Sequence, residues 1–324
     1  PFNTIKLKFT ETRHKTLTAE NVTSLIDKEF VETRIQRYNS LNVSLRDFAN
    51  IFLFQLFCQG MRVSDVILLR WQNLSFVNNE ILIEYNQFKT QKPIRARLTL
   101  LTCKFLIERL KIHYPNINEI LIEYDLTKNR IIENIDKANI LLKETEKDKK
   151  TYELLALKEN MNDKEFTRAS WELSQKELLT FYNLQLKELN ENLYAEFGKI
   201  INDLSQNNSN DFVFHFLQNN NYFKNYKTGE ILTKEQYASM TGKRAYYNNI
   251  LKVIQKQCNI NTKLTSHLAR HTYTQLLLDS NADLTAVSLS LGHSHLSTTQ
   301  TYISQLPNNS LLSINNTISN KFDK

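Results

Sequence analysis

Three short segments of this chain, far apart in the sequence, carry side chains whose types suit chemistry on a phosphodiester. They are residues 60–65 (Gly-Met-Arg-Val-Ser-Asp), residues 267–271 (His-Leu-Ala-Arg-His) and residues 291–293 (Leu-Gly-His), the last followed by Tyr302. Arginine binds two phosphate oxygens at once through its planar fork of donors and keeps its charge. Because His267 and Arg270 are three residues apart, a helix would present both side chains to the same spot. Together, two arginines, two or three histidines and a tyrosine form a set suited to a phosphodiester.

A zinc site is the alternative for the histidines, because His267 and His271 have the i, i+4 spacing of paired ligands on a helix. The glutamate of a zinc-protease motif is missing between them, and no carboxylate or cysteine stands nearby. We therefore expect no metal. A single histidine is more often a hydrogen-bonded core residue than a functional one, so the prediction rests on the whole set.

The composition of the 324-residue chain removes several other classes of protein. Its 41% of hydrophobic residues can fill a core, and only 5 glycines and 4 prolines favour long helices. The glycines are too far apart for a phosphate-binding glycine loop, so no nucleotide cofactor is expected. Three widely spaced cysteines give neither a disulfide framework nor a thiolate zinc site. No apolar run approaches about 18 residues and no signal peptide opens the sequence, so we expect a soluble intracellular protein with no membrane partner.

Charge is distributed unevenly along the chain. The formal net charge is +7, yet residues 116–211 hold 13 Lys and Arg against 19 Asp and Glu, a net of −6. The rest of the chain therefore has a net charge of +13. A strongly basic body is typical of a protein that binds a polyanion, most often nucleic acid. A basic surface that serves only solubility is the competing interpretation.

Helices dominate the elements that the sequence predicts around these segments. Residues 19–30 form a short helix capped by Thr16 or Thr18, and Ser44 caps a very apolar helix that Gly60 ends. Ser64 caps the next helix, which runs through Leu68, Leu69 and Trp71. Residues 81–88 and 93–100 read as two strands of a hairpin joined by residues 89–92. Further helices are expected over residues 233–257, 266–279 and 284–291.

The acidic middle of the chain has a different spacing of apolar residues. Apolar positions step by four and three, first from Ile131 to Ala156 and then from Leu178 to Leu204. Two such seams, broken around residues 160–163, predict an antiparallel, coiled-coil-like helical hairpin.

In their order along the chain, the three segments and the hairpin turn resemble the tyrosine recombinase (phage-type integrase) family. The family pattern is Arg, Lys, His-x-x-Arg, His or Trp, and Tyr. It is matched in order by Arg62, Lys89, His267, Arg270, His293 and Tyr302, with Lys92 as the rival of Lys89. The segment before Arg62 (Phe-Leu-Phe-Gln-Leu-Phe-Cys-Gln-Gly-Met-Arg) is most similar to recombinases of Bacteroidetes mobile elements. The matching stretches are residues 44–101 and 212–306.

The resemblance implies a fold class that is mainly α with a small β-hairpin or sheet (α+β). The catalytic domain would comprise residues 44–115 and 212–324, with an inserted helical hairpin at 116–211. Residues 1–43 would be a linker or the start of the catalytic domain, since they are too short for the family's N-terminal DNA-clamping domain. The insertion is unusual, because the family connects these elements by a much shorter segment.

The resemblance also implies roles for the individual residues. Tyr302 would attack the scissile phosphate and form a 3′-phosphotyrosyl intermediate, with no cofactor and no metal. Arg62 and Arg270 would hold the non-bridging oxygens, and Lys89 would protonate the leaving 5′-oxygen. His267 would assist proton transfer and His293 would donate to the phosphate, while Asp65 would orient an arginine and His271 would support the structure. Expected DNA contacts come from the following residues: Arg62, Lys89, Lys92, Lys243, Arg244 and Arg270.

The implied function is site-specific DNA recombination that integrates or excises a mobile element. The expected partners are double-stranded DNA, further copies of the chain in a tetramer on DNA, and an accessory protein at 116–211. The expected location is the bacterial cytoplasm, at the nucleoid. Two alternatives stay open: DNA relaxation of the type IB topoisomerase kind, and a non-catalytic DNA-binding scaffold with a coiled-coil partner arm. Tyr273 is a nearby competitor for the nucleophile, but it falls within the helix that carries Arg270 and is expected to pack there.

Overall fold

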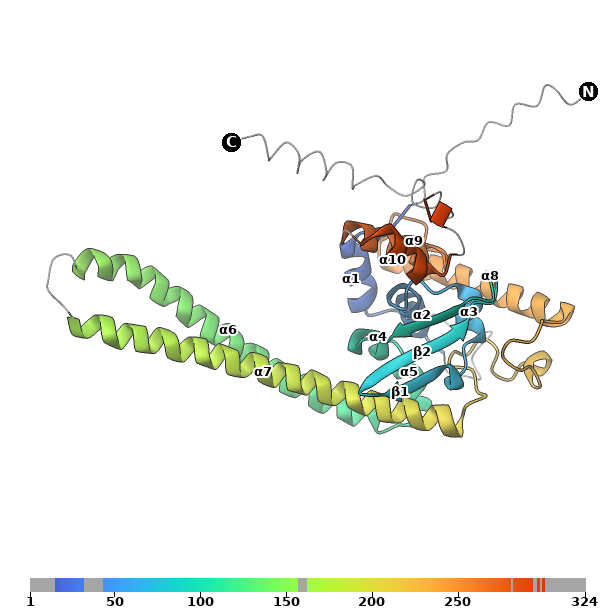
Figure 1. Ribbon diagram of the computed structural model, residues 1–324, viewed down its shortest axis with the longest axis horizontal. Coiled ribbons are helices and arrows are strands. Elements are labelled where there is room, and N and C mark those ends of the chain that lie inside the picture. Colours follow the sequence, from blue (N-terminus) through green and yellow to red (C-terminus); the bar gives the residue numbers. More distant parts are fainter. Residues whose placement is uncertain are drawn as a thin grey trace, which may run out of the picture. The chain divides into compact units, whose positions relative to one another are not determined.

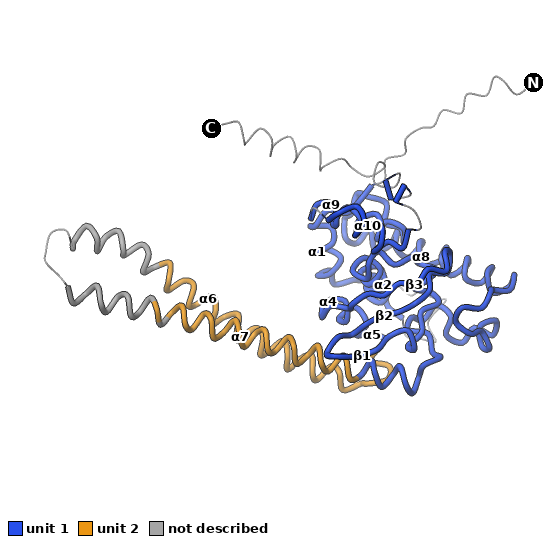
Figure 2. The backbone as a smooth tube through the Cα atoms, viewed as in Figure 1, with its two compact units in different colours: residues 1–109, 200–324 blue, residues 110–199 orange. Residues whose placement is uncertain are grey.

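The structure is a computed structural model that describes residues 15–31, 43–156, 162–280, 282–293, 296–297 and 299–300. Tyr302, the expected nucleophile, and the residues after it lie outside these described residues. The chain divides into two compact units, one of residues 1–109 and 200–324 and one of residues 110–199 (Figure 2). The first unit carries all of the described residues that the sequence singled out for chemistry. The expected insertion at 116–211 extends beyond the second unit, because Ile201 and Leu204 near the end of its last helix are buried within the first.

Helix α2 (Leu45–Phe57) is the centre of the first unit. Ser44 caps it as predicted: its hydroxyl accepts from the Asp47 backbone N–H, and the Asp47 carboxylate accepts from the Ser44 backbone N–H. All of its residues except Arg46 and Phe57 are buried. It packs against α1 (Ala19–Asp27), α4 (Leu100–Lys104), α8 (Lys234–Gln257) and α9 (Leu268–Asp279). Thr18 caps α1 and Thr233 caps α8, each through a reciprocal side-chain to backbone pair.

The helix after Gly60 begins earlier than predicted. Helix α3 spans Val63–Leu68, and Arg62 occupies its N-cap position without a side-chain hydrogen bond, so the prediction that Ser64 caps it is wrong. It also ends before Trp71, which is buried and starts a 3₁₀ turn (Trp71–Asn73). The Trp71 backbone N–H donates to the carbonyl of Asp211, a residue far along the sequence, and therefore does not continue the hydrogen bonding of α3.

Three antiparallel strands in the order β1-β2-β3 form the only sheet in the described part of the chain. They are β1 (Leu74–Val77), β2 (Glu80–Asn86) and β3 (Pro93–Arg97), with Ile83 paired to both Leu74 and Ala96. The β2–β3 hairpin was predicted and β1 was not. The strands stop at Asn86 and begin again at Pro93, because residues 87–92 close a turn by their own hydrogen bonds.

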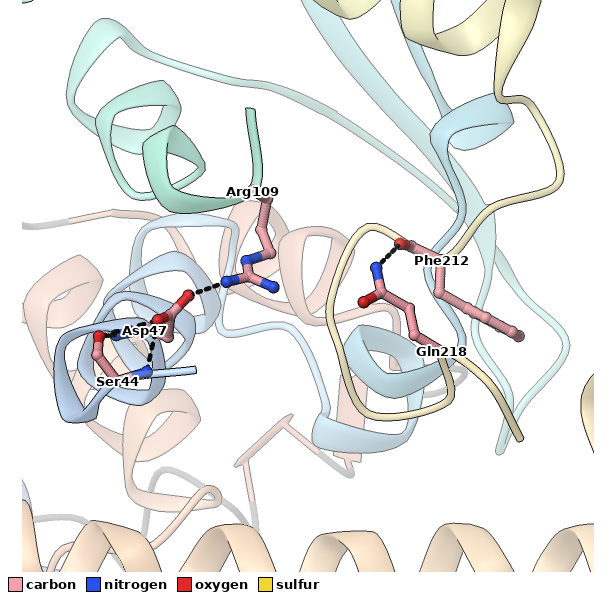
Figure 3. A network of polar contacts seen from close by, with 5 residues as sticks. All are labelled: Ser44, Asp47, Arg109, Phe212 and Gln218. Atoms are coloured by element: carbon pink, nitrogen blue, oxygen red, sulfur yellow. Dashed lines mark hydrogen bonds and ion pairs between the residues drawn. The ribbon is translucent and has the colours of Figure 1, made fainter. Parts of the chain in front are cut away.

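A buried ion pair fixes α5 (Ile107–His113) to the centre of the first unit (Figure 3). Arg109 donates through Nη2 to Asp47 Oδ1, and both side chains are at least 94% buried. The same Asp47 carboxylate accepts from Ser44, so one residue serves both as cap partner and as ion-pair partner. Removing either charge would leave the other buried without compensation.

The second unit is the helical hairpin (Figure 1). Helix α6 (Ile117–Ala156) and helix α7 (Asn162–Asn207) run back along each other, and α7 continues into the first unit. The Tyr124 hydroxyl donates to Asn190 Oδ1 at 2.6 Å, and Ile131, Ala138 and Leu193 are buried. These apolar residues belong to the seams predicted from the sequence.

The last helices lie close to their predicted positions. Helix α8 matches the prediction after Thr233, and α10 (Leu284–Leu291) matches it at both ends. Helix α9 starts at Leu268, so His267 stands at its N-cap position and not inside it. Together with the small sheet, these helices give the predicted fold class, mainly α with a little β. Within the described residues, no helix has an apolar stretch long enough to cross a membrane.

Candidate active site

One cleft in the first unit collects residues from four separate stretches of the chain: the start of α3, the β2–β3 turn, one face of α8, and the segment that leads into α9. The following residues line it: Arg62, Val63, Ser64, Ile67, Phe88, Lys89, Tyr237, Met240, Thr241, Arg244, Asn248, Thr265, Ser266 and His267. Three of the residues singled out in the sequence, Arg62, Lys89 and His267, are therefore neighbours around one space, although about 200 residues separate the first and the last.

Arg62 enters this cleft from the N-terminal end of α3. The segment before it is held by Gln55, whose Nε2 donates to the Met61 carbonyl at 3.0 Å and whose Oε1 accepts from the Tyr247 hydroxyl at 3.1 Å. Arg62 Nη1 is buried and has no hydrogen-bond partner among the described residues. A buried guanidinium nitrogen without a partner is costly in isolation, and an anion bound at the cleft would satisfy it.

Arg270 is held much more tightly. It is 3% exposed and donates to the Gly60 carbonyl at 3.2 Å and to the Leu291 carbonyl at 2.5 Å. Its Nη2 also lies 3.3 Å from His293 Nε2. Gly60 has a φ of +59°, and a Cβ there would lie 3.1 Å from the Arg270 Cα. A glycine at this position therefore permits both the left-handed turn and the close approach of α9.

The His293 ring lies between Arg270 and Thr299, and each of its two nitrogens contacts one of them. Its Nδ1 lies 2.9 Å from the Thr299 hydroxyl. Burial, with Arg270, Arg62 and Lys92 nearby, lowers the pKa of His293 to about 4, so the ring is neutral at pH 7. Because a guanidinium can only donate, Nε2 is the acceptor here and Nδ1 carries the proton. Donation from Nε2 to a phosphate, as expected from the sequence, requires the ring to change its proton position or its partner when substrate binds.

Asp65 joins the first arginine segment to the turn that carries Lys89. Its Oδ1 accepts from the Phe88 backbone N–H at 2.7 Å. Burial raises the pKa of Asp65 to about 6, while the Phe88 N–H, Arg62 and Arg270 oppose that rise. The carboxylate therefore fixes the turn, which the sequence did not indicate. Its other oxygen, Oδ2, is buried and has no hydrogen-bond partner among the described residues, so the role of Asp65 in orienting an arginine stays a prediction.

The two candidate lysines have different surroundings. Lys89 is exposed and lines the cleft with Arg62 and His267. Lys92 is half-buried, and its Nζ donates to the His293 carbonyl at 3.1 Å. The Lys92 ammonium group is therefore bound to the backbone at His293. Lys89, by contrast, lines the cleft in which a substrate would lie.

The remaining residues of interest divide between the cleft and the core. His267 is exposed on the cleft, and its ring lies 4.6 Å from that of His271, which is buried. The Tyr273 hydroxyl lies 2.7 Å from the Ser290 hydroxyl, so this tyrosine packs between α9 and α10 as expected.

Of the expected DNA contacts on α8, Arg244 lines the cleft and Lys243 does not.

Sequence reasoning missed several residues of this site. Tyr237, Thr241 and Asn248 stand beside Arg244 on one face of α8, and their spacing of four, three and four residues was a signal that could have been read. Gln55 and Gln87 gave no such signal, because a glutamine whose side chain hydrogen-bonds a backbone carbonyl looks like any other polar residue in the sequence.

In a comparison with known proteins, residues 187–309 match the phage integrase family. The tyrosine recombinase XerD of Staphylococcus epidermidis is 42% identical over 73 residues, which is 22% of this chain and 25% of that protein. XerD of Staphylococcus saprophyticus is 40% identical over 74 residues, with the same shares of the two chains. The chain thus matches about a quarter of the length of these curated relatives. A crystal structure of the XerA recombinase aligns over 93% of this chain and 64% of its own, with a TM-score of 0.42 and 13% identity.

Proposed function

We propose that the chain contains a tyrosine recombinase catalytic domain and is a site-specific DNA recombinase that cuts and rejoins DNA through a 3′-phosphotyrosyl intermediate. The substrate would be double-stranded DNA, bound by several copies of the chain. We assign its reaction to the integration or excision of a mobile element, on the strength of the family resemblance around Arg62.

The observation that carries this proposal is the meeting of Arg62, Lys89 and His267 at one cleft. Arg62 Nη1, which has no partner among the described residues, would supply a donor for a non-bridging phosphate oxygen. Arg270, which donates to the Gly60 carbonyl, is the second guanidinium that we assign to the phosphate, and His293 would donate with it once its ring changes its proton position or its partner. Donors fixed before the reaction stabilise the negative charge that develops in the transition state, and this is often the largest single contribution to catalysis.

The chemistry conserves one phosphodiester bond throughout. The Tyr302 oxygen attacks phosphorus, and the bond between phosphorus and the 5′-oxygen breaks, so a 3′-phosphotyrosine and a 5′-hydroxyl form. The tyrosine proton passes to His267, and the Lys89 ammonium gives a proton to the leaving 5′-oxygen, which would otherwise depart as a poor leaving group. A 5′-hydroxyl of another strand reverses these steps. Because the covalent link stores the bond energy, the reaction needs no nucleotide.

A nicked DNA substrate that loses its short 5′-hydroxyl strand on cleavage would trap the intermediate as a protein–DNA adduct. We expect the native sequence to form this adduct and Tyr302→Phe to form none while it binds DNA equally well, because only the attacking oxygen is lost. Tyr222→Phe is the matched control, since that side chain is 60% exposed and lies outside the cleft. An adduct with Tyr302→Phe, or none with the native sequence, would refute the proposal. Relaxation of plasmids of any sequence would contradict site specificity.

A further inference from the structure

Gln87 is a buried amide at the base of an exposed, polar turn. It is 1% exposed, whereas Lys89, Thr90 and Gln91, which follow it between β2 and β3, are exposed. Burying an amide is unfavourable unless its donors and acceptor are used. The hydrogen-bond partners of the Gln87 amide therefore show which parts of the structure this residue connects.

The contacts of Gln87 close the turn on itself. Its backbone N–H donates to the Lys92 carbonyl at 2.8 Å, and its carbonyl accepts from the Gln91 N–H at 2.7 Å. Its side-chain Oε1 accepts from the Thr90 hydroxyl at 2.7 Å. Lys89 lies inside the loop that these three bonds define, so its backbone is fixed relative to Gln87.

The other end of the amide reaches across the site. Gln87 Nε2 donates at 3.1 Å to the Leu291 carbonyl, which is the same oxygen that accepts from Arg270 Nη2. The fit is close, because Gly292 has a φ of +63° and a Cβ there would lie 2.7 Å from Gln87 Nε2. The Leu291 carbonyl oxygen thus binds both the turn that carries Lys89, through Gln87, and Arg270. Leu291 also lies directly before the segment that leads into His293.

We propose that Gln87 is a positioning residue that sets the location of Lys89 relative to the phosphate held by the arginines. The inference rests on the proposed function, since it assigns to Lys89 the proton that the leaving 5′-oxygen receives. A general acid must lie within about 2.6–3.2 Å of the atom that it protonates, so a small displacement of the turn removes its contribution. Gln87 itself does not line the cleft.

A substrate in which sulfur replaces the bridging 5′-oxygen separates this role from a general loss of structure. In both substrates the Tyr302 oxygen forms a bond to phosphorus and the bond to the 5′-atom breaks. Oxygen leaves with a proton from Lys89, whereas sulfur leaves as a stable thiolate and needs no proton. A variant that misplaces only Lys89 is therefore slow on the oxygen substrate and normal on the sulfur substrate.

The test compares Gln87→Met, which keeps the side-chain length but loses the hydrogen bonds, with Gln91→Met as a matched control. Gln91 belongs to the same turn, but its side chain donates only to the Phe88 carbonyl within that turn. Single-turnover cleavage is measured on both substrates. General acid catalysis contributes about 10²–10⁴-fold, so we expect Gln87→Met to cleave the oxygen substrate at least about 10-fold more slowly. Its rate on the sulfur substrate, and both rates of Gln91→Met, should stay within about twofold of the native values.

Equal losses on the two substrates, or no loss on either, would overturn the role of Gln87 while leaving the proposed function intact. Native protein that cleaves neither substrate would overturn the proposed function as well. If Gln87→Met does not fold, Thr90→Val removes only the hydroxyl that holds the amide. We then expect a smaller loss confined to the oxygen substrate, and an equal effect of Thr90→Val on both substrates would contradict the inference.

Discussion

At the scale of single residues, the two arginines of the candidate site are held in different ways. Arg270 is buried and bonded to the carbonyls of Gly60 and Leu291, whereas Arg62 keeps a buried nitrogen without a hydrogen-bond partner in the described part of the chain. Arg270 therefore has a structural task besides any contact with phosphate. Arg62 is the arginine whose unused donor suits a ligand.

Arg62→Ala and Arg270→Ala should lose similar amounts of cleavage activity but differ in their unfolding temperatures. Losing one preorganised donor to a developing oxyanion costs about 10²–10³-fold in rate, so we expect both variants to cleave DNA at least that much more slowly. Arg270→Ala should also unfold at a lower temperature, because two backbone carbonyls lose a buried donor. Arg62→Ala should unfold near the native temperature. Single-turnover adduct formation and thermal melts measure the two effects, and cleavage at the native rate by Arg62→Ala would remove it from the chemistry.

At the scale of elements, the end of α10 meets the β2–β3 hairpin at Gly292. A side chain at Gly292 would be strained by the φ of +63° and would lie 2.7 Å from both Gln87 Nε2 and Ile94 Cδ1. Left-handed backbone alone costs a non-glycine residue about 1–2 kcal/mol. The close contacts add to that cost, because Gln87 and Ile94 are both buried.

Gly292→Ala should therefore destabilise the protein by more than about 1 kcal/mol. The control is Gly242→Ala, because Gly242 lies in the interior of α8 and a Cβ there would meet nothing within 4 Å. That change should stabilise the protein by about 0.5–1 kcal/mol through helix propensity. Chemical unfolding of both variants measures the difference, and a neutral Gly292→Ala would contradict the close packing between Gly292 and the hairpin.

The elements that the sequence predicted best are those with local signals. Ser44 was recognised as the cap of α2, and the predicted ends of α8 and α10 lie within one residue of the observed ones. Strand β1 was missed because it is only four residues long, too short for an alternating pattern to be distinguished from chance. Pairing of Gln87 with the Leu291 carbonyl joins residues 204 apart, and nothing local encodes it. The residue types of the site could thus be read from the sequence, but the contacts that fix their positions could not.

At the scale of the whole molecule, the residues that line the cleft all belong to the first unit. None of the described residues of 110–199 is among them. The base of the hairpin has its own contacts, among them the bond from the Tyr124 hydroxyl to Asn190 and the buried side chains of Leu193 and Phe197. The net charge of −6 over residues 116–211 also makes this part of the chain a poor binder of phosphates.

Replacing residues 128–187 by a short Gly/Ser linker should leave tyrosine-dependent DNA cleavage within a few-fold of the native rate. This shortened chain keeps Tyr124, Asn190 and the buried residues at the base of the hairpin, so the first unit should fold as before. Adduct formation on the nicked substrate and complete strand exchange are measured side by side, because loss of exchange alone would assign the hairpin to assembly. A folded variant that binds DNA and fails to cleave it would show that the hairpin belongs to the active site.

The most direct test of the central claim is to identify the amino acid and the DNA end in the covalent adduct. The adduct formed on the nicked substrate is digested, the DNA-linked peptide is sequenced by mass spectrometry, and DNA labelled on either side of the break shows which end is attached. The proposed function predicts a peptide linked through Tyr302 to a 3′-phosphate, with a free 5′-hydroxyl on the other strand end. Attachment through another residue, or to a 5′-phosphate, would contradict this account.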